Sequence, residues 1–448
     1  MHHTTARAWG FVAVAVAIGL VRSASALDGG TLRVLPRNGW KAIEVISQTD
    51  DPAGDGFAYV VPGTFDGIGA WLPEPSTLRI VVNHETGDAS ISEANLNLAD
   101  FQSAIANMIA GGTTGGVSFV DSARQAYGRW TNDGGANFLP TADATTTAFQ
   151  RFCSGQSFKP HFYGQNSGFV DDIYMTGEEV AGGRMFALDL AGRDFYRLSG
   201  ITGSAPGGLG GFPADSWESA ALLDTGETNH VALLVSPDGG TQILKLYVGE
   251  KGKDKTGAPS NDFLARNGLA WGSFYYLNDA LPTSGTSTDG FIDTTTAGAL
   301  LSSKLEDVDA NPNDGTQAVL GDEDSGMFTF DFNLDFTTGS FNAAASTFSI
   351  TRVLGHANDI DGQFGDIDNV DWTAATSVGG TPRPNGFLLA NEDSGTGGGE
   401  TWILAPNGDG LTLIADTIGA GLGTETTGVL DISDLVGYPP ASILVTAN

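Results

Sequence analysis

The chain has 448 residues, including 63 glycines and one cysteine, and its formal net charge is -32. This charge argues against a nucleic-acid-binding role, because a phosphate backbone needs a basic partner surface. It equally argues against binding to an anionic membrane surface. The single Cys153 excludes an internal disulfide framework. Two explanations of the acidity stay open: a need for solubility, as in a saline habitat, and binding of divalent cations by the carboxylates.

The N-terminal segment has the pattern of a secretory signal peptide. Residues 1–7 are weakly basic, residues 9–21 are apolar, and Ala24-Ser25-Ala26 is a small-residue cleavage site. The apolar run is too short to span a bilayer. We therefore expect a secreted or periplasmic protein, cleaved after Ala26, whose mature chain (residues 27–448) is one domain.

Strand-like runs dominate the mature chain. They cover residues 56–61, 78–82, 172–175, 184–190, 230–235, 242–248, 317–320, 327–332, 348–353, 386–389, 401–405 and 411–414. Most alternate between apolar and polar residues or are short and apolar, with Gly, Asn, Asp or Pro between them. Helical periodicity is strong only at residues 91–109, with a second candidate at 296–304.

Acidic clusters join consecutive strands in three places, at residues 177–179, 322–326 and 391–395. This recurrence is typical of a β-propeller in which each blade delivers a carboxylate loop to one end of the central axis. We predict an all-β fold with a single β-propeller. Six blades are favoured and seven are possible, with insertions near residues 90–165 and 250–300.

The run at residues 78–82 ends in Asn83-His84-Glu85, and other strand-like runs also carry acidic residues at their ends. These are Glu178, Glu179, Glu218, Glu306, Asp307, Asp368, Asp371 and Glu392. Two carboxylates about 4 Å apart repel by roughly 1–4 kcal/mol, so a convergent set would take up protons or bind cations. Oxygen ligands suit calcium, and an added thiolate or imidazole suits a transition metal such as iron. For Cys153 a buried structural role and a ligand role both remain open.

Several short motifs occur in a characteristic order. They are PGTFDGIGA at 62–70, NHE at 83–85, CSG at 153–155, TGEE at 176–179, WESAALLDTG at 217–226, LYVGEK at 246–251 and KLED at 304–307. In this order the sequence resembles the PhoX-like alkaline phosphatases, which are exported β-propeller phosphomonoesterases that use iron and calcium. The resemblance covers residues 61–391.

The resemblance implies a set of site residues. The metal ligands would be Glu85, Cys153, Glu178, Glu218, Glu306 and Asp368, with Cys153 as the thiolate ligand of iron. Lys304 takes the place of a phosphate-binding arginine, and Asn83 and His84 would help to position the ester. The sequence departs from the family in two ways: the signal lacks a twin arginine, and the family's Cys-Glu-Glu reads Gly177-Glu178-Glu179.

The predicted function is that of an exported, metal-dependent phosphomonoesterase acting on small-molecule phosphate esters, with calcium and iron as cofactors. Two alternatives stay open. One is a non-catalytic binding propeller stabilised by calcium, and the other is a lactonase-type calcium propeller hydrolase. The oligomeric state is not indicated by the sequence.

Overall fold

The computed structural model describes residues 14–19, 34–48, 59–111, 113–114, 116–140, 149–164, 167–206, 208–356, 365–393, 399–417 and 426–447. Across these ranges the helices are α1 (Leu98–Ile109), α2 (Phe263–Arg266) and the 3-10 turn η1 (Ala343–Ala345). None of these helices is long and apolar enough to cross a membrane. All other regular structure in the described ranges is β-strand.

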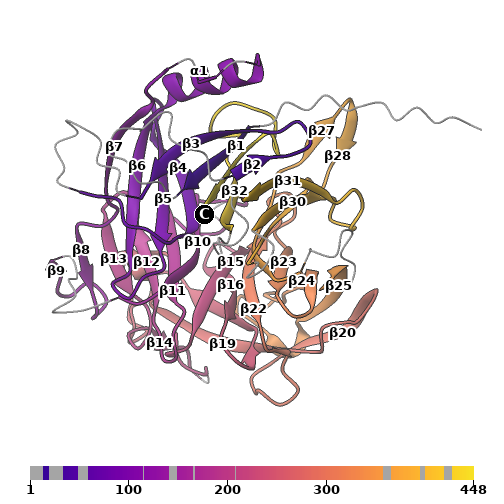
Figure 1. Ribbon diagram of the computed structural model, residues 1–448. Coiled ribbons are helices and arrows are strands. Elements are labelled where there is room, and N and C mark those ends of the chain that lie inside the picture. The colour runs from indigo at the N-terminus through magenta and orange to yellow at the C-terminus, as the bar shows by residue number, and fades with distance from the viewer. Residues whose placement is uncertain are drawn as a thin grey trace, which may run out of the picture.

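The strands form blades that follow one another around the molecule in chain order (Figure 1). The first blade consists of β4 (Phe65–Glu74), β5 (Thr77–His84), β6 (Ser90–Asn97) and β7 (Val120–Gln125). The second consists of β10 (Phe152–Phe158), β11 (Ile173–Glu178), β12 (Met185–Asp189) and β13 (Asp194–Arg197). The third consists of β15 (Trp217–Leu223), β16 (His230–Pro237), β18 (Lys245–Glu250) and β19 (Trp271–Asn278).

The remaining blades complete the ring. The fourth blade consists of β22 (Leu305–Ala310), β23 (Gln317–Asp322), β24 (Gly326–Asn333) and β25 (Thr347–Gly355). The fifth consists of β26 (Ile367–Trp372), β29 (Leu388–Glu392), β30 (Glu400–Leu404) and β31 (Thr412–Thr417). The sixth consists of β32 (Thr427–Asp431), β33 (Ile443–Ala447), β1 (Val14–Gly19) and β3 (Lys41–Ser47). The innermost strands β4, β10, β15, β22, β26 and β32 contact one another in this order, and β32 contacts β4. The described strands therefore confirm an all-β propeller, with six blades.

Short strands extend or connect the blades. They are β2 (Val34–Pro36), β8 (Arg129–Thr131), β9 (Leu139–Pro140), β14 (Gly203–Ser204), β17 (Gln242–Ile243), β20 (Thr286–Asp293), β21 (Leu301–Ser302), β27 (Thr376–Val378) and β28 (Thr381–Arg383). Strand β20 pairs with both β19 and β25 and so joins the third and fourth blades. Residues 90–165, where we expected an insertion, supply β6, β7 and β10, and residues 250–300 supply β19 and β20.

The apolar core lies between neighbouring blades rather than at one centre. One cluster packs Trp71 and Val81 of the first blade against Phe152 and Phe186 of the second. Other clusters join the second blade to the third, the third to the fourth, the fourth to the fifth, the fifth to the sixth and the sixth to the first. Each blade is thus buried on both faces, which explains why its strands are short apolar runs.

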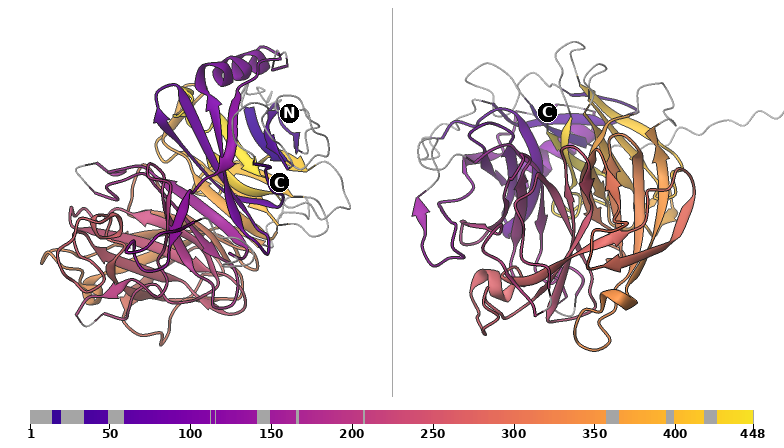
Figure 2. Two further views of the ribbon diagram at one scale, coloured as in Figure 1. Left: turned by 90° about the vertical axis from the view of Figure 1, so that its left-hand side faces the viewer. Right: turned by 90° about the horizontal axis from the view of Figure 1, so that it is seen from below.

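The helix predicted at residues 91–109 is only half helical. Its first part is β6, which pairs with β5 and β7. Helix α1 begins after Asn97, whose side chain accepts a hydrogen bond from the backbone N–H of Asp100 at 3.2 Å, and it lies at the rim of the molecule (Figure 2, left). Pairing with two neighbouring strands outweighs the helical pattern. Residues 296–304, the second predicted helix, contain a turn and β21.

The last blade contains both N- and C-terminal strands. Strand β1 lies between β3 and β33 and runs parallel to both. It falls within the predicted signal segment, whose cleavage site at Ala26 lies outside the described residues. Removal of this segment remains a prediction.

Candidate metal centre

The innermost strands share one irregularity. In each of the six described blades, the first residue of the innermost strand pairs with the last residue of the next strand, and the register shifts directly afterwards. Such a bulge re-aims the side chain at the irregular position. The irregular position is the second residue of each innermost strand. In the six blades it is occupied by Asp66, Cys153, Glu218, Glu306, Asp368 and Gly428. We call the first five the inner ring.

A second set of acidic residues follows the neighbouring strands at the same end of the propeller. These are Glu85, Glu179, Asp238, Glu323 and Asp393, which we call the outer ring. In each case the backbone N–H donates to the carbonyl of the residue just before the innermost strand, at 2.9–3.1 Å. The first five blades therefore repeat one local structure, and each presents two side chains to the same end of the propeller.

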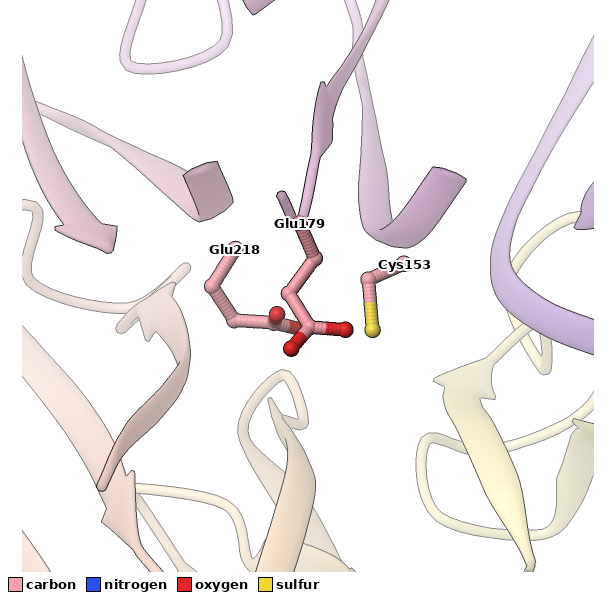
Figure 3. A group of neighbouring side chains, drawn as sticks. All are labelled: Cys153, Glu179 and Glu218. Atoms are coloured by element: carbon pink, nitrogen blue, oxygen red, sulfur yellow. The ribbon is translucent and has the colours of Figure 1, made fainter. Parts of the chain in front are cut away.

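Members of the two rings converge in two clusters. Ligand atoms of Cys153, Glu179 and Glu218 all lie within 4.8 Å of one another, and Figure 3 shows their side chains pointing to a common centre. Ligand atoms of Glu218, Glu306 and Asp368 also all lie within 4.8 Å of one another. Glu218 belongs to both, so the first cluster and the second cluster are adjacent.

Burial dominates the electrostatics of these clusters. It raises the pKa of Glu218 to about 8, and the neighbouring carboxylates of Asp238 and Asp307 add to the effect. Burial and the Glu218 carboxylate likewise raise the pKa of Glu179 to about 8. The pKa of the Cys153 thiol is raised well above its ordinary value by burial, and then by the carboxylates of Asp66 and Glu218. Without a cation, the clusters therefore hold protons.

The donor atoms fit a metal ion. Oε2 of Glu218 and Oδ1 of Asp238 are buried without a hydrogen-bond partner among the described residues. A buried carboxylate oxygen without a donor is costly, unless a cation supplies the missing interaction. Four carboxylates and one thiol around two adjacent positions therefore provide a suitable site for cations.

Lys304 lies at the same end of the propeller. Its Nζ is 2.9 Å from Oε1 of Glu306, 3.1 Å from Oε2 of Glu323 and 3.2 Å from Oδ2 of Asp238. Burial lowers the pKa of Lys304, but the Glu306 carboxylate and the other two acidic groups raise it further, so the net shift is upward. One-third of the side chain is exposed. Lys304 is therefore a permanent positive charge beside the second cluster.

Two of the predicted ligands belong to neither cluster. Glu178 pairs with Arg184 and accepts hydrogen bonds from the backbone N–H groups of Gln150 and Arg184, both at 3.0 Å. It fixes the loops beside the site, and the adjacent Glu179 joins the first cluster instead. Glu85 pairs with the guanidinium of Arg151.

The predicted positioning residues Asn83 and His84 lie inside the sheet. Nδ2 of Asn83 donates to the carbonyl of Cys153 at 2.5 Å and to Oγ1 of Thr176 at 2.8 Å. The ring nitrogens of His84 lie 3.0 Å from the carbonyl of Gly63 and 2.6 Å from Oγ of Ser92. Burial lowers the pKa of His84 to about 4, so its ring is neutral. Asn83 thus supports the backbone of the thiol-bearing strand, and His84 is part of the internal hydrogen bonding of the first blade.

The structure also explains the missing thiol at Gly177. A Cβ atom there would lie 2.3 Å from Cβ of Trp217 and 2.7 Å from its carbonyl oxygen, so no side chain fits. Cys153 reaches the first cluster from β10, the strand that pairs with β11. Its Sγ also lies 3.1 Å from Oδ2 of Asp66.

Sequence reasoning did not assign several members of the rings as ligands. Glu179 was named only among the acidic residues at strand ends, Glu323 and Asp393 lay in the acidic clusters between strands, and Asp66 and Asp238 were not named. Each sits at a fixed place relative to a strand end, one residue inside the innermost strand or one residue beyond its neighbour. A search for acidic residues at these two positions in every blade would have found them.

A cavity of about 250 Å³ lies further along the same innermost strands. Its wall includes Asp309 and Asp371. Oδ2 of Asp309 accepts the backbone N–H of Trp372 at 2.7 Å, and Oδ2 of Asp371 accepts the backbone N–H of Asp431 at 3.0 Å. These carboxyls therefore connect neighbouring innermost strands and differ in role from the two rings.

Comparison with known proteins identifies similar structures and no family. No protein-family model matches the sequence, and neither does any curated protein. The structure of Pseudomonas fluorescens PhoX in complex with vanadate, a transition state analogue, aligns with 94% of this chain and 91% of its own, with 13% identity and a TM-score of 0.54. A putative 6-phosphogluconolactonase from Bacteroides uniformis aligns with 81% of this chain and 74% of its own, with 11% identity and a TM-score of 0.33. The similarity to PhoX shows a shared propeller fold.

Proposed function

We propose that the protein is a PhoX-like, metal-dependent phosphomonoesterase that releases phosphate from small organic phosphate esters. The observation that carries this proposal is the placement of Lys304 beside the second of two adjacent clusters that share Glu218. A positive charge at one side of a pair of adjacent cation sites is an arrangement suited to a phosphoryl group. The ordered motifs and the fold shared with PhoX support it.

The proposed ligands are Cys153 and Glu179 in the first cluster, Glu306 and Asp368 in the second, and Glu218 in both. The carboxylates suit calcium, and the thiol gives the first cluster an affinity for iron. When bound, these ions would neutralise charge on the phosphoryl group and lower the pKa of a bound water molecule.

The chain itself binds and orients the ester. Lys304 is held by three carboxylates, so its ammonium group has a fixed position and can attract the dianionic phosphate. The Asn83 amide fixes the Cys153 carbonyl, and the Glu178–Arg184 pair fixes the loop that carries Glu179. These contacts hold the ligand set in place before a substrate arrives.

Hydrolysis of p-nitrophenyl phosphate tests the proposal, with elemental analysis of the same samples. We expect the protein loaded with calcium and iron to hydrolyse the ester, and Glu218→Gln to lose at least about 100-fold in activity because both clusters lose a ligand. Glu250→Gln is the matched control, since Glu250 forms a surface pair with Lys253. Full activity in Glu218→Gln would refute the assignment. Bound calcium without any hydrolysis would instead favour a binding propeller.

We further propose that residues 1–26 direct export and are removed after Ala26. N-terminal sequencing of the exported protein tests this. A mature chain that starts at Leu27 supports it, and a mature chain that retains β1 in the last blade contradicts it.

A further inference from the structure

In two blades, the residue just before the innermost strand has a positively charged side chain. The residue just before the innermost strand is Arg151 in the second blade and Lys304 in the fourth. The carbonyl of Arg151 accepts the N–H of Glu179 at 3.0 Å, and the carbonyl of Lys304 accepts the N–H of Glu323 at 3.1 Å. Arg151 and Lys304 therefore occupy equivalent backbone positions in their blades, and both lie at the end of the propeller that carries the two rings.

The surroundings of Arg151 match those of Lys304. Its Nε lies 2.7 Å from Oε1 of Glu85, and its Nη2 lies 2.5 Å from Oε2 of Glu179. Because Glu179 belongs to the first cluster, the guanidinium lies against that cluster as Lys304 lies against the second. About half of the Arg151 side chain remains exposed (49%), which leaves donor groups accessible to a ligand.

The backbone of Arg151 is held in a costly conformation. Its φ is +43°, in the left-handed region that non-glycine residues seldom adopt. The neighbouring chain fixes it from both sides, through the bond from its N–H to the carbonyl of Thr86 at 2.9 Å and the bond from Glu179. Strain that is fixed in this way is common at ligand-binding sites.

We propose that Arg151 is a second phosphate-binding residue, which contacts the phosphoryl oxygens of the substrate from the side of the first cluster while Lys304 contacts them from the side of the second. This inference rests on the proposed function. The planar guanidinium can donate two parallel hydrogen bonds to two phosphate oxygens, whereas the ammonium of Lys304 acts as a point charge. Arg151 would thus orient the phosphoryl group, and Glu85 would hold the guanidinium in position.

Binding of inorganic phosphate to the full chain loaded with calcium and iron tests the proposal by calorimetry. We expect Arg151→Gln to weaken phosphate binding by about 10- to 100-fold, the effect of losing a charge-assisted pair of hydrogen bonds. KM for p-nitrophenyl phosphate should rise, the calcium and iron contents should stay unchanged, and Arg151→Lys should recover part of the affinity. Arg129→Gln is the matched control, because Arg129 pairs with Asp194 away from the clusters and should bind phosphate normally.

The possible results separate this inference from the proposed function. Phosphate binding by the unaltered protein together with unchanged binding by Arg151→Gln would overturn the role of Arg151 alone. No phosphate binding by the unaltered, metal-loaded protein would overturn the proposed function and this inference with it. Loss of metal together with phosphate in Arg151→Gln would show that Arg151 only positions Glu179, which also overturns the proposal.

Discussion

Replacing Gly177 by alanine should destabilise the propeller next to the metal centre. The new methyl group would lie 2.3 Å from Cβ of Trp217, far inside ordinary contact distance. Trp217 is fully buried at the start of β15, so its backbone cannot move without disturbing the packing between the second and third blades. An overpacked core position typically costs about 1–3 kcal/mol, and we expect about 2 kcal/mol here because the clash is with a Cβ atom and a carbonyl rather than a flexible side-chain end.

Urea unfolding of the variant, followed by fluorescence in the presence of a chelator, measures this cost. Gly87→Ala is the matched control, because no atom lies within 4 Å of a Cβ atom at Gly87. The control should unfold within about 0.5 kcal/mol of the unaltered protein. If Gly177→Ala were as stable as the control, the steric explanation for the absence of a thiol at this position would be wrong.

Three further predictions concern the thiol, the ion pair of Glu178 with Arg184, and the cavity whose wall includes Asp309 and Asp371. Cys153→Ser should lose iron but retain calcium, because serine is a poor soft ligand, and elemental analysis measures both. Glu178→Gln should lower the free energy of unfolding in urea by about 3–5 kcal/mol, because it removes the charge of Glu178 from the buried ion pair with Arg184. Normal stability would contradict a supporting role. Burial raises the pKa of Asp309 to about 6, so the native carboxyl retains its proton up to a higher pH than the unfolded one, and stability is lost as the pH rises from about 4 to 6. Asp309→Asn should weaken this dependence, so that its stability relative to the unaltered protein improves as the pH rises across that window, as unfolding in chelator at several pH values would show. A parallel pH dependence of the two proteins would refute the assignment.

The fold class follows from local sequence patterns. Short apolar or alternating runs between glycine-rich turns indicate strands wherever they occur, and acidic loops between strands indicated a propeller. The helix predicted at residues 91–109 fails in its first half for a reason that local patterns do not contain. Strand β6 has partners on both sides, and that pairing is made by β5 and by β7, which begins more than 20 residues after β6 ends.

The choice between Glu178 and Glu179 illustrates the same limit within the site. Adjacent residues at a strand end point in different directions, and a shift of one residue in register exchanges them. The structure places Glu178 against Arg184 and Glu179 in the first cluster. Neither the motif nor its spacing contains that information.

The sequence by itself determined the chemical inventory: an acidic chain, one thiol, carboxylates at strand ends and a lysine near them. It therefore indicated cation binding, because charge and ligand chemistry belong to the residues themselves. The resemblance to the PhoX-like phosphatases added Cys153, Glu218, Glu306 and Asp368 to the expected ligands. Only the tertiary structure decided which of these groups meet. Closure of the ring places the starts of β10, β15, β22 and β26 at one end, and the bulge in each strand turns one side chain inward. Glu218 and Asp368, which meet in the second cluster, are 150 positions apart in the chain, and no local pattern specifies the distance between them.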